Sequence, residues 1–179
     1  CIEADDKTFS RQIGQLVNLS NLVDNWLFFQ AIGGFDNSNK NVYYAARNEN
    51  GNYRGYFIPW DLNISFGAVY ADNKYYAEET LEETGTQVQF EPGCRAIALD
   101  ADHARALAKE KWEDWKEKAF TAEALLERAQ HLQQELTGSG AMAREMERWP
   151  GGNASTDLSL LTEFTKQRMA YMDSMIDGL

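Results

Sequence analysis

The chain has 179 residues, of which 44% are hydrophobic, and this is enough apolar material for one folded domain. Its 17 basic and 28 acidic residues give a net charge of −11, which argues against nucleic acid as a partner because phosphate backbones select basic surfaces. No apolar run approaches the roughly 20 residues that span a bilayer, so no membrane span is predicted.

The first 32 residues are predicted to be helical. A weak amphipathic stretch is followed by a second helix over residues 21–32, for which Ser20 is the expected N-cap. This second helix is apolar on almost every side, as is typical of a buried helix. Gly33 and Gly34 are expected to end it.

A polar loop and a β-hairpin are predicted next. The loop reads DNSNKN over residues 36–41. The expected strands cover residues 42–46 and 53–58, with a turn at residues 48–52. Asn50-Gly51 in this turn is a strong hairpin signal because both residue types tolerate positive φ.

The second half of the chain is predicted to be helical after a long loop. Residues 67–93 show no clear period and read as an irregular acidic segment closed by Pro92-Gly93. Four helices are then expected, over residues 100–118, over residues 121–138, over residues 141–148 and onward from an N-cap at Asp157. The predicted fold class is therefore α+β and mostly helical, with one hairpin and a C-terminal helical bundle in a single domain over residues 1–179.

Three polar residues have an order typical of phosphoryl transfer. Asp36 and Asn41 are separated by four residues, and Asp61 comes at the end of the second predicted strand. Protein kinases place an Asp that accepts the proton of the attacking hydroxyl, an Asn after four more residues, and a later Asp, the last two binding magnesium. The alternative is that Asp and Asn act here only as ordinary turn residues.

The same segments carry a resemblance to a known family. The runs LVDNWLFFQAIGGFDNSNKNVYYAA and GYFIPWDLNISFG, with AREMERW and LLTEFTKQRMAYM near the end, resemble the CotH family of atypical kinases, which is related to a bacterial spore-coat protein. The resemblance covers most of the chain and is weak between Ala68 and Ala98. It implies the C-terminal lobe of a kinase-like fold that uses ATP and Mg²⁺ (or Mn²⁺) to phosphorylate Ser or Thr of protein substrates.

The resemblance also implies roles for individual residues. Asp36 matches the catalytic Asp, and Asn41 and Asp61 match the metal ligands. Asn63 stands where the family usually has a second acid, so weaker metal binding is expected there. Lys40 is a lesser candidate for phosphate contact, with a solvated loop lysine as the alternative.

Neither a glycine-rich lid nor a strand lysine precedes Asp36. The chain is therefore expected to be the C-terminal part of a larger kinase-like domain, without its nucleotide-binding lobe and with little activity alone. The acidic charge suits a basic or Ser-rich protein substrate. The family resemblance alone suggests a spore coat, cell-surface or secreted location.

Two other functions stay open at this stage. One is a non-catalytic coat or surface interaction protein that keeps the kinase-like fold, and the other is a helical scaffold in which the hairpin is only structural. In the scaffold case, the carboxylates of Asp36 and Asp61 are expected to lie far apart.

Overall fold

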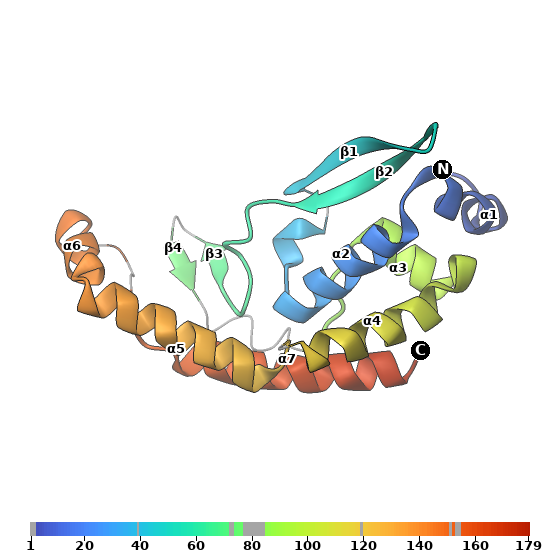
Figure 1. The fold of residues 1–179 in the computed structure, drawn as a ribbon. Helices are drawn as coiled ribbons and strands as arrows, with labels where there is room; N and C mark the ends of the chain where they lie inside the picture. Colours follow the sequence, from blue (N-terminus) through green and yellow to red (C-terminus); the bar gives the residue numbers. More distant parts are fainter. Residues whose placement is uncertain are drawn as a thin grey trace.

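A computed structural model describes residues 3–38, 40–71, 74–76, 85–118, 120–150, 152 and 155–179. The predicted α+β class is confirmed, because helices dominate and the strands form two small antiparallel sheets (Figure 1). The described elements are α1 (Asp6–Leu16), α2 (Leu19–Ile32), β1 (Val42–Glu49), β2 (Asn52–Pro59), β3 (Val69–Ala71), β4 (Lys74–Tyr76), α3 (Glu91–Ala98), α4 (Ala104–Glu117), α5 (Ala122–Gly138), α6 (Ala141–Arg148) and α7 (Ser159–Asp177).

Helix α2 is the centre of the core, as its apolar pattern predicts. Trp26, Leu27 and Phe29 are fully buried, and the helix packs against α3, α4, α7 and β2. Its N-cap is Asn18, whose side chain accepts a hydrogen bond from the Asn21 amide, and not Ser20 as the sequence suggested. Asn and Ser are equivalent caps by propensity, so only the surrounding structure decides between them.

The hairpin is longer than predicted and lies across α2 (Figure 1). Its register pairs Val42 with Pro59 and Glu49 with Asn52, around the expected Asn50-Gly51 turn. Two buried or half-buried amides of α2 hold β2 in place at Phe57. The Asn21 side-chain oxygen accepts from the Phe57 amide at 2.7 Å, and Asn25 donates to the Phe57 carbonyl at 3.1 Å.

The segment predicted as one irregular loop contains more structure than expected. It holds the short β3–β4 pair and the start of α3, while residues 77–84 lie outside the described part. Pro92 does not close a loop but stands in the first turn of α3, where its missing amide hydrogen is harmless. The interpretation of Pro92-Gly93 as the end of a loop is therefore wrong.

The C-terminal helices are four, as predicted, but they form an incomplete bundle. Helix α4 begins at Ala104 because Asp100, Asp102 and His103 have positive φ. Helix α7 lies along α4 and α5, whereas α5 and α6 extend beyond the body (Figure 1). No residue of α5 or α6 is fully buried, so the apolar stripe predicted for α5 is only partly covered.

Asp157, the predicted cap of α7, accepts from the Ser159 amide at 2.9 Å, although the helix boundary falls at Leu158. None of the described helices is both long and apolar enough to cross a membrane.

Candidate active site

The structure brings Asp36, Lys40 and Asn41 together at the end of α2. Asp36 lies in a single 3₁₀ turn, Phe35–Asn37, directly after the glycines that end the helix. The Asn41 side-chain amide donates to Asp36 Oδ2 at 2.5 Å, and Lys40 Nζ lies 2.8 Å from Asp36 Oδ1. Both carboxylate oxygens of Asp36 are thus paired within the same loop.

The loop of Asp61 is attached to this one through the backbone. The Trp60 amide donates to the Asn41 carbonyl at 2.9 Å. The buried Asn37 side chain donates both to the Asn41 carbonyl at 2.9 Å and to the Trp60 carbonyl at 2.8 Å. The polar segment before the hairpin and the segment after it are therefore joined directly before Asp61.

Lys40 lies within the electrostatic influence of both acids. A hydrogen bond to Asp36 and the charge of Asp36 raise the pKa of Lys40, and the charge of Asp61 raises it further. Both Asn41 and Asp61 have positive φ, at 58° and 51°. This backbone region is uncommon for side-chain-bearing residues and is often found at functional sites.

The polypeptide after Asp61 returns to the end of α2. The Phe66 amide donates to the Ile32 carbonyl at 2.7 Å. Gly33 and Gly67 both pack on the buried Phe164 ring of α7, and a Cβ on Gly33 would lie 2.6 Å from its Cζ. Asn63 is exposed in this returning segment, two residues after Asp61.

A buried arginine holds together the segments next to the site. Arg168 of α7 donates to the Gln30 carbonyl at 2.5 Å and to the Thr86 carbonyl at 2.7 Å. Its guanidinium also lies 5.7 Å from the centre of the Phe35 ring, next to Asp36. One side chain thus connects α7, the end of α2 and the segment before α3.

Sequence reasoning missed both Asn37 and Arg168. Asn37 was one of several Asn residues in a polar run, and nothing local marks it as the buried one. Arg168 stands among other polar residues of a helix, and only its fractional exposure of 0% distinguishes it.

The donor set of the site suits a hard cation. Asp36 and Asp61 carry carboxylate oxygens, and Asn41 and Asn63 carry amide oxygens, and these are the ligand types that Mg²⁺ and Mn²⁺ prefer. Asn41 uses its nitrogen for Asp36, so its side-chain oxygen is the atom available to a cation. Among the described residues, no group of three or more His, Cys, Asp or Glu side chains is placed to hold a metal ion.

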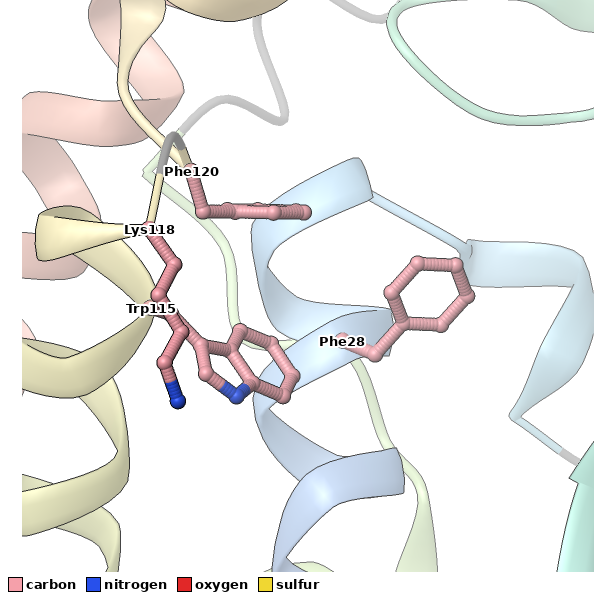
Figure 2. A pocket seen from close by; sticks show the side chains of 4 residues that line it. All are labelled: Phe28, Trp115, Lys118 and Phe120. Carbon is pink, nitrogen blue, oxygen red and sulfur yellow. The ribbon is translucent and has the colours of Figure 1, made fainter.

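An aromatic hollow lies between α2 and the end of α4. Phe28, Trp115, Lys118 and Phe120 line a space of about 360 Å³ (Figure 2). A neighbouring space of about 300 Å³ shares Phe28 and Trp115 and reaches Pro59, two residues before Asp61. The lining is mostly apolar, so this surface can accept apolar groups, with Lys118 and Asp24 as the charged residues at its edges.

Comparison of the chain with curated proteins and with solved structures gives no match. A family profile described as CotH kinase protein matches residues 1–172, which is nearly the whole chain and includes every candidate site residue. The protein therefore belongs to the CotH kinase protein family.

Proposed function

We propose that this protein is the catalytic and metal-binding part of an atypical protein kinase, which transfers the γ-phosphoryl group of ATP to Ser or Thr of a protein substrate. The single observation that carries the proposal is the Asn37 amide, which joins the loop of Asp36 to the loop of Asp61. Membership of a kinase family supports the same chemistry.

In the proposed reaction, Asp36 accepts the proton of the substrate hydroxyl. The hydroxyl oxygen forms a bond to the γ-phosphorus, the bond from that phosphorus to the bridging oxygen breaks, and ADP leaves. Asn41, Asp61 and Asn63 would hold Mg²⁺ or Mn²⁺, which supplies positive charge against the phosphates. Lys40 would contact a phosphate oxygen as a point charge.

We further propose that this chain forms the C-terminal lobe of a larger kinase-like domain, with the ATP base and ribose held by another lobe. The hairpin would then face that lobe, since several of its large side chains are exposed. These are Tyr43, Tyr44, Tyr53, Ile58 and Trp60. A basic substrate fits the net charge of −11.

The test is phosphotransfer from labelled ATP by the full-length protein to a basic Ser/Thr peptide mixture, with Mg²⁺ or Mn²⁺. Asp36→Asn and Asp61→Ala should each lower the rate at least about 100-fold, because they remove the base and a metal ligand. Asp114→Asn is the matched control, since Asp114 makes an exposed pair with Lys118 away from the site. Full activity of Asp61→Ala would contradict the assignment.

A non-catalytic interaction protein is the second candidate. The exposed aromatic residues of the hairpin and the amide at Asn63 in place of an acid favour it. Thermal unfolding of the full-length protein with ATP and Mg²⁺ separates the two functions. A rise in Tm supports the kinase, and an unchanged Tm supports the interaction protein.

A further inference from the structure

Lys40 lies directly against the proposed catalytic carboxylate of Asp36. Its ammonium lies 2.8 Å from Asp36 Oδ1, on the carboxylate that would have to accept the substrate proton. The other oxygen, Oδ2, accepts from Asn41. In this state Asp36 has no carboxylate oxygen without a partner.

The charges around Lys40 explain why it lies there. Asp36 and Asp61 are two acids on loops that Asn37 holds together, and like charges held close repel each other. The ammonium of Lys40 is attracted by both of them, with Asp36 the nearer partner. One positive charge thus partly neutralises two negative ones.

We propose that Lys40 is an internal counter-ion of the active site, which holds Asp36 until a divalent cation enters and displaces it. This inference rests on the proposed function and adds a regulatory step to it. With a cation bound, Asp36 Oδ1 would be free to accept from the substrate hydroxyl, and the ammonium of Lys40 would lie near the phosphates. Asp36 would become competent only when the metal is bound.

The side chain is suited to such an exchange. The Lys40 side chain is 68% exposed, and that of Asp36 is 20% exposed. The charged end of the pair contributed by Lys40 is largely solvated, and such pairs add little net stability, so a divalent ion can compete with it.

The alternative is that Lys40 and Asp36 form an ordinary surface pair of residues four apart. Lys118 and Asp114 make such a pair elsewhere, at 2.7 Å and with Lys118 71% exposed. The two pairs match in spacing, in distance and in the exposure of the lysine. They differ in the exposure of the acid, which is 20% for Asp36 and 48% for Asp114, and in the second acid and the Asn residues near Lys40. Lys118→Met is therefore the control for Lys40→Met.

The experiment titrates the protein with Tb³⁺, an oxygen-preferring ion that stands in for Mg²⁺ or Mn²⁺. Its emission can be excited through Trp60, which is exposed and precedes Asp61. Isothermal titration with Mn²⁺ gives a second readout that needs no catalysis. The variants are Lys40→Met, Lys40→Arg, Lys118→Met and Asp61→Asn.

Lys40→Met should bind Mn²⁺ about tenfold more tightly than the wild type, which is the effect of removing one unit charge about 6 Å from a divalent ion in a water-like medium. For trivalent Tb³⁺ the same argument gives about thirtyfold. Lys40→Arg and Lys118→Met should bind within about twofold of the wild type, because neither changes the charge at the site. Added salt should reduce the difference in ion affinity between Lys40→Met and the wild type, because it screens the charge of Lys40.

The outcomes separate the inference from the proposed function. If Asp61→Asn weakens ion binding but Lys40→Met leaves the affinity unchanged, the counter-ion role of Lys40 is overturned and the metal site is supported. Binding by Lys40→Met alone supports the counter-ion in its strongest form. No binding by any variant, or binding that Asp61→Asn does not weaken, overturns both.

Discussion

The side-chain amide of Asn37 donates a 2.8 Å hydrogen bond to the carbonyl of Trp60, across 23 residues of sequence. The same nitrogen donates to the Asn41 carbonyl. One buried amide thus determines where the hairpin begins and ends relative to Asp36. The predictions below test this arrangement and its supports.

Asn37→Ala should lower the free energy of unfolding by about 2–3 kcal/mol, because it leaves the Trp60 carbonyl without this donor and opens a small cavity. Urea unfolding followed by circular dichroism measures the change. Asn48→Ala removes an exposed bond to the Gly51 amide in the hairpin turn and should change stability by less than about 1 kcal/mol. Equal losses in both variants would show that Asn37 has no special role.

Gly33→Ala should lower the free energy of unfolding by more than the strain of its positive φ alone explains. Both Gly33 and Gly51 have positive φ, but a Cβ meets the Phe164 ring at Gly33 and nothing within 4 Å at Gly51. We expect about 1 kcal/mol of destabilisation for Gly51→Ala from strain, and about 3 kcal/mol for Gly33→Ala from strain plus overlap. The difference in denaturation midpoints between the two variants measures the close approach, and its absence would argue against it.

Arg168→Met should destabilise the protein by about 3–5 kcal/mol. The substitution keeps an unbranched apolar stem but leaves the Gln30 and Thr86 carbonyls without their charged donor in a buried place. Arg128→Met, at an exposed position of α5, should stay within about 0.5 kcal/mol. Chemical denaturation measures both, and similar stability of the two variants would contradict the structural role of Arg168.

Glu49 should make part of the stability dependent on acid. A hydrogen bond from Tyr56, with further help from Asn18 and Arg54, lowers the pKa of Glu49. A carboxylate with a lowered folded-state pKa stabilises the fold above its ordinary pKa of about 4.3, and loses that contribution as pH falls through the folded-state value. The stability gap between wild type and Glu49→Gln should therefore shrink between about pH 5 and pH 3.

Tyr56→Phe is the companion variant for this pH dependence, because it removes the hydroxyl that donates to Glu49 while keeping the ring. It should remove most of the same acid-dependent part of the free energy of unfolding that Glu49→Gln removes. A gap that stays constant with pH would show that Glu49 has no lowered pKa in the folded protein.

Local chemistry was enough to predict much of the fold from sequence. The buried helix, the glycines after it and the Asn50-Gly51 turn follow from side-chain polarity and backbone angles, which act over a few residues. Asp36, Lys40 and Asn41 lie together for a similar reason, since these residues share one short loop. The catalytic and metal-binding roles assigned to them stay predictions.

Contacts between distant segments were decided only by the tertiary structure. Ser20 and Asn18 have equal capping chemistry, Pro92 can close a loop or open a helix, and an Asn in a polar run can be buried or exposed. In each case the energy difference comes from partners that lie far away in the sequence, as Trp60 does for Asn37 and Gln30 does for Arg168. The sequence alone determined which residues could form the site. The packing of α7 and of the hairpin on α2 determined which loops meet there. Sequence could not show this, because hydrogen bonds and close contacts between remote segments leave no periodic signal in the chain.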